Sequence, residues 1–132
     1  MAKLECFSVV VSNKPGKGAH LLSVLKEAGV NFVAVWGYPV GKKKARFDLV
    51  AEDPALLKKA ARQLKIDLGK KRTAFHIAGA DQAGAVAEIL AQLADKKINV
   101  NSIQAVAAGA GVFGAVLQVD SDDVKKAAKA LA

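Results

Sequence analysis

Cysteine is nearly absent from the chain. Cys6 is the single cysteine among 132 residues, so no disulfide can form within the chain. No apolar run approaches the roughly 18 residues that span a bilayer, and the opening MAKLECFSVVV lacks the long apolar region of a secretory signal. Cys6 is therefore expected to be a small apolar filler in a reducing compartment. We expect a cytoplasmic protein with no membrane partner.

Residues that carry common catalytic chemistry are also scarce. The chain has two histidines, His20 and His76, and neither stands at metal-ligand spacing from a cysteine, a histidine or an acidic cluster. No arrangement of a nucleophile with a base is visible. Asp120, Asp122 and Asp123 are expected to mark the start of a helix. We therefore expect no metal, no cofactor and no enzymatic activity.

The residues that are abundant predict a folded protein with light packing. Hydrophobic residues make up 52% of the chain and aromatic residues only 5%, so small aliphatic side chains must build a thin core, and pairing with a second copy would add stability. The net charge is +8, with +6 in residues 1–68 and +2 in residues 69–132. The dense cluster of Lys42, Lys43 and Lys44 with Arg46 is expected at an exposed hairpin tip.

The sequence repeats itself when it is shifted by 68 positions. The matching positions are turn glycines, core leucines and an asparagine at one junction: Gly16 with Gly84, Leu22 with Leu90, Leu25 with Leu93, Asn31 with Asn99, and Gly41 with Gly109. Because the matches fall at structurally demanding places, they indicate two related domains, residues 1–68 and 69–132.

Both repeats predict the element order β-α-β-β-α. In the first, β-branched content predicts strands at 3–11, 30–40 and 45–51, and helical spacing predicts helices at 15–28 and 54–64. Pro15 is expected in the first turn of its helix, and Asp53 is expected to cap the next one. The second repeat predicts strands at 72–79, 98–107 and 112–119, with helices at 83–96 and 122–131.

With a fourth strand, this order becomes the ferredoxin-like βαββαβ sandwich, an α+β fold with antiparallel sheets and helices on one face. Residues Lys65 to Leu68 are the candidate for the fourth strand of the first repeat. The second repeat has no residues left for one, so we expect an incomplete sheet there, open to completion by a partner.

The turn sequences carry a family resemblance. The run Asn13-Lys14-Pro15-Gly16 between a strand and a helix, followed by Ala28-Gly29-Val30-Asn31 at the start of the next strand, resembles the ACT domain. Asp81-Gln82-Ala83-Gly84 and Lys97-Ile98-Asn99 stand in the same places of the second repeat. The resemblance covers nearly the whole chain as two tandem copies.

The resemblance implies a regulatory module that binds a small ligand, usually an amino acid, between two such domains. The implied contacts are the first strand–helix loop of one domain and the start of the second strand of its neighbour. The implied ligand-binding residues are Asn13, Lys14, Pro15, Gly16, Asn31, Asp81, Gly84 and Asn99.

Physical chemistry agrees with such a site. A helix start offers unpaired N–H groups to a carboxylate, glycine lets a ligand approach the backbone, and an asparagine amide both donates and accepts. Turn formation alone would also explain Asn13. Asp81 would repel a ligand carboxylate, so the two sites should differ.

The leading interpretation is a stand-alone regulatory sensor, without catalysis, that acts on a separate enzyme or regulator. The first alternative is RNA binding with the topology of the RNA-recognition motif, using Phe7, Trp36, Tyr38 and Phe47 beside the lysine cluster; the full motif is absent, so we expect no specific nucleic acid. The second is a ligand-free oligomerisation module. The run Gly109 to Gly114 spells G-x-G-x-x-G, but it maps onto a hairpin and predicts no dinucleotide site.

Overall fold

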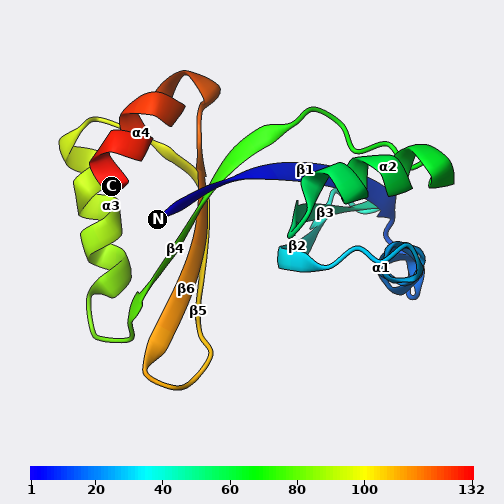
Figure 1. Ribbon diagram of the computed structural model, residues 1–132, viewed down its shortest axis with the longest axis horizontal. Helices are drawn as coiled ribbons and strands as arrows, with labels where there is room; N and C mark the ends of the chain where they lie inside the picture. The colour runs from blue at the N-terminus through cyan, green and yellow to red at the C-terminus, as the bar shows by residue number, and fades with distance from the viewer. The chain divides into compact units, whose positions relative to one another are not determined.

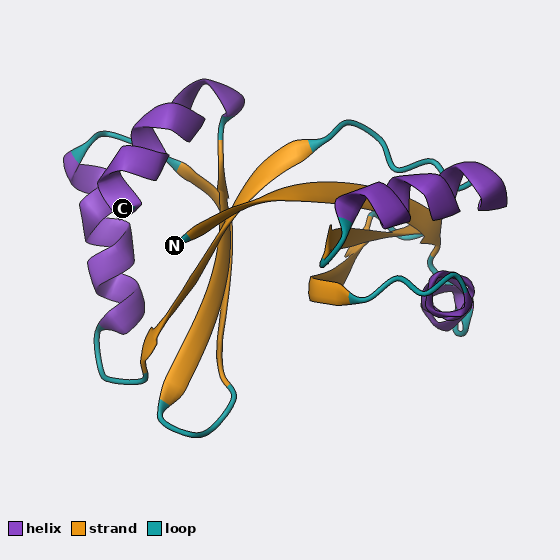
Figure 2. Cartoon of the chain, viewed as in Figure 1, coloured by secondary structure: helices purple, strands orange, loops and turns teal.

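The computed structural model describes residues 1–132 and shows an α+β architecture of six strands and four α-helices (Figures 1 and 2). The chain divides into two compact units. The first unit comprises Glu5–Arg72, and the second unit comprises Thr73–Ala132 together with Met1–Leu4. The unit boundary thus lies a few residues beyond the predicted repeat boundary, and the second unit also takes in the start of the chain.

The first unit contains β1 (Ala2–Ser12) from Glu5 onward, α1 (Lys17–Glu27), β2 (Phe32–Val40), β3 (Lys44–Ala51) and α2 (Pro54–Leu64). Its strands are antiparallel in the order β2-β3-β1. Side chains alternate between the two faces of the sheet. Phe47 of β3 lies among core residues that include helix leucines, so the neighbouring Asp48 lies on the opposite face.

The second unit contains β4 (Arg72–Ala80), α3 (Ala85–Asp95), β5 (Val100–Ala107), β6 (Val112–Val119), the short 3-10 helix η1 (Ser121–Asp123) and α4 (Val124–Leu131). Its strands are antiparallel in the order β4-β6-β5. The element order β-α-β-β-α therefore occurs twice along the chain, as the sequence predicts. No helix is long and apolar enough to cross a membrane.

Each unit has its own hydrophobic core between sheet and helices. The core of the first unit joins Phe7, Leu25, Leu49 and Leu57, and that of the second joins Phe75, Ile89, Leu93 and Leu117. Two of the three buried side chains of α2 are alanines, Ala60 and Ala61. This is the light, thin packing that the composition predicts.

Helix α1 begins at Lys17, and the prediction that Pro15 lies in its first turn is wrong. Gly16 takes the N-cap position with φ of 90°, a left-handed conformation that ends the turn and leaves Pro15 outside the helix. Gly84 does the same before α3, with φ of 86°. The shared glycine therefore sets the helix start in both units.

Residues Lys65 to Leu68 do not form the expected fourth strand. Lys65 is a left-handed C-cap of α2, and the N–H of Ile66 donates to the carbonyl of Ala61 at 2.8 Å, which holds this segment to the helix end. One backbone hydrogen bond, from Ser8 N–H to the Leu68 carbonyl at 3.2 Å, joins the segment to β1.

The glycine run after β5 is a hairpin turn, as predicted. Gly109, Ala110 and Gly111 all have positive φ, and β6 follows where a dinucleotide fingerprint would need a helix.

Candidate functional site

The loop before α1 is fully at the surface, with Asn13, Lys14, Pro15 and Gly16 all exposed. The backbone N–H of Asn13 donates to the Lys43 carbonyl at 2.9 Å, which anchors the loop beside the β2–β3 turn. The amide Nδ2 of Asn13 lies 3.5 Å from the Lys42 carbonyl, at the limit of hydrogen bonding. The Asn13 amide is therefore only weakly committed within the protein.

Helices α1 and α3 begin without a capping side chain, unlike α2. Asp53 accepts hydrogen bonds from the N–H groups of Ala55 and Leu56 at the start of α2. The glycine N-caps of α1 and α3 have no side chain to do this. A Cβ built on Gly16 would meet nothing within 4 Å, so the start of α1 also opens into free space. Unpaired N–H groups at such a helix start favour an anionic group.

Asn31 lies at the other end of the sheet from Asn13. The register places Ser12 opposite Lys44 and Phe32 opposite Ala51, so the two asparagines flank opposite ends of β3. The Asn31 amide donates to Glu52 Oε2 at 2.8 Å. Within one unit, the structure does not bring the two asparagines together, and a shared ligand would need two domains.

In the second unit, Asp81 and Gly84 line a depression of about 420 Å³ together with Ala105, Val106 and Ala107 at the end of β5. Asn99 is exposed before the start of β5, away from this depression. Asn101 instead makes the bond that Asn31 makes in the first unit, donating to Asp120 at 2.8 Å. Asp120 stands at the position of Glu52 in the repeat, and this carboxylate is the signal that could have identified Asn101.

A buried carboxylate that the sequence analysis did not single out lies on the sheet face opposite the helices. Asp48 is 1% exposed. It accepts hydrogen bonds from the hydroxyl groups of Ser8 and Tyr38, from Arg46 Nε at 3.1 Å and from an Arg72 terminal nitrogen at 2.8 Å. A lone aspartate inside the apolar strand sequence Phe47-Asp48-Leu49 is the signal that points to it.

The surroundings of Asp48 keep it ionised. Burial by itself would raise its pKa, but hydrogen bonds from Ser8, Tyr38 and Arg72 and the charge of Arg72 outweigh burial and lower the pKa. Burial and the hydrogen bond to Asp48 raise the pKa of Tyr38. Cys6 is fully buried, as expected of an apolar filler, and burial raises its thiol pKa to about 11. These groups form a structural cluster with an inert thiol.

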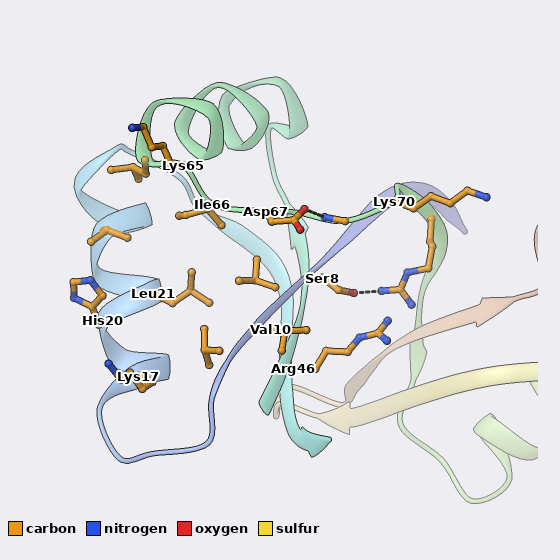
Figure 3. A pocket seen from close by; sticks show the side chains of 16 residues that line it. Ser8, Val10, Lys17, His20, Leu21, Arg46, Lys65, Ile66, Asp67 and Lys70 are labelled. Carbon is orange, nitrogen blue, oxygen red and sulfur yellow. Dashed lines mark hydrogen bonds between the residues drawn. The ribbon is translucent and has the colours of Figure 1, made fainter. Parts of the chain in front are cut away.

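A cleft of about 760 Å³ lies in the first unit between α1, the outer side of β1 and the segment after α2 (Figure 3). Apolar side chains line most of it: Val9, Val10, Val11, Leu21, Val24, Leu64 and Ile66. Its charged lining residues are Lys17, Arg46, Lys65, Lys70 and Arg72, with Asp67 as the acidic one. The sequence analysis named none of these as site residues, because the cleft depends on a strand that does not form.

Comparison with known proteins finds solved structures with a similar fold, but at low sequence identity. No family model and no curated protein matches the chain. Protein BT0572 from Bacteroides thetaiotaomicron superposes with a TM-score of 0.85 at 18% identity, covering 98% of this chain and 86% of that one. The ligand-free regulatory subunit of aspartate kinase from Thermus thermophilus gives 0.63 at 14% identity, over 97% and 89%. The corresponding Thermus flavus subunit gives 0.55 at 18% identity, over 97% and 89%.

These likenesses extend over nearly the full length of this chain and of the regulatory subunits. At such low identities they establish the architecture. The chain has an ACT-like fold.

Proposed function

We propose that this protein is a non-catalytic regulatory sensor, built from two ferredoxin-like ACT-like repeats, that binds a small amino acid at an interface between domains. Ligand binding would favour one arrangement of domains, and a separate enzyme or regulator would read that arrangement. Support comes from the ACT-like fold. It also comes from the two Thermus chains, which are regulatory subunits of aspartate kinase and match this chain over 89% of their length.

The observation that carries the proposal is the uncapped start of α1 beside the Asn13 amide. The helix N-terminus suits the ligand carboxylate. Asn31 from an adjacent domain would supply the other half of the site, because its amide oxygen and the Glu52 carboxylate at 2.8 Å from its Nδ2 both accept hydrogen bonds from an ammonium group. A zwitterion, with its carboxylate at the start of α1 and its ammonium group at Asn31 and Glu52, therefore fits this site better than a simple anion would.

The four aromatic residues that the RNA-binding alternative requires do not form a surface for base stacking. Phe7 is 5% exposed and Phe47 packs beside it in the core under the helices. Trp36 lies opposite Asp48 in the strand register, on the other face of the sheet. The four aromatic side chains thus do not share one surface on which successive bases could stack.

The test is a thermal-shift screen of the twenty amino acids, followed by calorimetry with the ligand that shifts the melting temperature most. Asn13→Ala and Asn31→Ala should each weaken binding by roughly 1–3 kcal/mol, because a charged ligand group loses its partner. Stability should change little in both, since the hydrogen bonds they lose are exposed.

Asn101→Ala is the matched control, since Asn101 makes the same bond to a carboxylate in the second unit. It should leave the affinity of the first-unit site unchanged. Unchanged affinity in both Asn13→Ala and Asn31→Ala would mean that these asparagines only form turns. A screen in which no amino acid raises the melting temperature would instead favour a ligand-free oligomerisation module.

A further inference from the structure

The cleft beside β1 exists because the segment after α2 does not form a fourth strand and joins β1 by only one backbone hydrogen bond, that from Ser8 to Leu68. The Ser8 N–H points away from β3, toward the Leu68 carbonyl. Since backbone groups alternate along a strand, those of Val10 point the same way. The segment after α2 cannot follow β1 that far, because Ile66 is bonded back to Ala61. The edge of β1 at Val10 therefore opens into the cleft.

The interior of the cleft is aliphatic and partly exposed to solvent. Leu21 is 5% exposed and forms the wall on α1, whereas Val10 and Leu64 are 57% and 42% exposed. Figure 3 shows Leu21 projecting from α1 and Ile66 lying on the segment after α2. Its volume lies within the roughly 300–1,000 Å³ typical of small-molecule sites. An aliphatic chain placed here would cover apolar surface that water now contacts.

The charges around the cleft select for an anion. Five of its lining residues are basic, and its one acidic residue, Asp67, already accepts the N–H of Gly69 at 2.9 Å. Asp48 offsets part of the charge of Arg46 and Arg72, yet it engages Arg46 only through Nε. The terminal nitrogens of Arg46, at one end of the cleft, remain able to hold a carboxylate in a forked geometry.

We propose that this cleft is a second ligand site, separate from the loop before α1, that binds an aliphatic monocarboxylate. The alkyl chain lies along Val10, Leu21 and Leu64, and the carboxylate lies at Arg46. An amino acid fits less well, because the excess of basic groups repels an ammonium group. An added peptide strand also fits less well, because only the four residues of β1 beyond Ser8 are left, fewer than the five or six residues of a usual strand.

Calorimetry with sodium octanoate, below its micellar concentration, tests the site in the full-length chain. Octanoate should bind saturably at one site per chain, acetate should fail because it lacks the alkyl chain, and octylamine should fail because its charge has the wrong sign. Amide chemical shifts of the wild-type protein should change with octanoate at Val10, Leu21 and Ile66.

Leu64→Glu places a negative charge beside the alkyl chain and should weaken octanoate binding about tenfold or more. Leu90→Glu is the matched control, because Leu90 is 37% exposed on a helix of the second unit; it should bind octanoate like the wild type. Circular dichroism of both variants confirms folding. Equal binding of octylamine, equal affinity in Leu64→Glu, or shift changes confined to other residues would each overturn the proposal, whether or not an amino acid binds at Asn13.

Discussion

Asp48 is the residue whose replacement should cost this protein most. Its side chain is almost fully buried and receives hydrogen bonds from Ser8 of β1, Tyr38 of β2, Arg46 of β3 and Arg72, the last residue of the first unit. A buried carboxylate is tolerated only where such partners replace its water shell. The cluster therefore ties β1, β2, β3 and the end of the first unit to one another.

We expect Asp48→Asn to lower the free energy of unfolding at pH 7 by about 2–3 kcal/mol. This is somewhat below the loss typical of fully buried pairs, because both arginine side chains are one-third exposed. Urea unfolding of both proteins measures the difference.

The pH dependence separates charge from packing. The native pKa of Asp48 is lowered, so its stabilising effect is fully present above the unfolded-state pKa of about 4 and is lost as the pH falls through the native pKa. The gap between wild type and Asp48→Asn should therefore shrink as the pH is lowered from about 5 to about 2. A gap that stays constant over this range would assign the loss to packing alone.

At the scale of helices and strands, the sequence predicted the element order. Of the repeated leucines expected in the core, Leu25 and Leu93 are fully buried, but Leu90 is 37% exposed, so that part of the core prediction is wrong. Helix α2 and strand β6 begin and end where the spacing of apolar residues and the Asp53 cap place them. The misses in element bounds share a physical cause. Whether Pro15 belongs to α1, or residues 65–68 to a strand, depends on local backbone conformation at Gly16 and Lys65, which periodicity does not report.

The candidate site was less predictable than the fold. Turn chemistry identified the loop at Asn13, and the repeat identified a junction asparagine. Three-dimensional register decided which asparagine of the second unit faces a carboxylate, and Asn101 rather than Asn99 does so. The cleft at Val10 results from a strand that fails to form, and no spacing of residues in the sequence encodes that failure.

Phe47 illustrates how the two units solve one packing problem differently. Its ring occupies the space beside two glycines: a Cβ added to Gly18 or Gly37 would lie 2.5 Å or 2.7 Å from a ring carbon. The repeat places Ala115 at the position of Phe47 and Val86 and Ala105 at the positions of these glycines. In the second unit an alanine thus stands in place of the phenylalanine, and residues larger than glycine stand in place of both glycines.

This difference predicts a change of sign in a double-mutant cycle. Gly37→Ala alone should destabilise the protein by about 1–3 kcal/mol, because the added methyl group meets the Phe47 ring. In the Phe47→Ala background the same change should be neutral or stabilising, since alanine restricts the unfolded chain. Gly114→Ala, whose Cβ would lie 3.8 Å from His76, is the control that should not destabilise. Equal cost of Gly37→Ala in both backgrounds would rule out the steric explanation.

At the scale of the whole molecule, the outermost strands are the surfaces that most need an explanation. β2 is the outer strand of the order β2-β3-β1, and β5 is the outer strand of β4-β6-β5. β2 exposes Val33, Val35 and Val40, and Val106 of β5 is 68% exposed. Neither strand carries the lysines that usually protect an open edge. Such edges favour pairing, which the light cores would also make stabilising.

We therefore expect the protein to form a homodimer by edge-to-edge pairing, and the double variant Val35→Lys, Val106→Lys to shift it to the monomer. Charged lysines at both edges oppose strand pairing without entering either core. Light scattering coupled to size-exclusion chromatography should give twice the chain mass of 13.7 kDa for the wild type and the single mass for the variant. Val112→Lys, at a 47% exposed position of the inner strand β6, should remain dimeric. A wild-type protein that is monomeric at every concentration tested, or a double variant that stays dimeric, would contradict the edge-to-edge arrangement, and the first result would also remove the neighbouring domain of a second copy as the source of Asn31 for the amino-acid site.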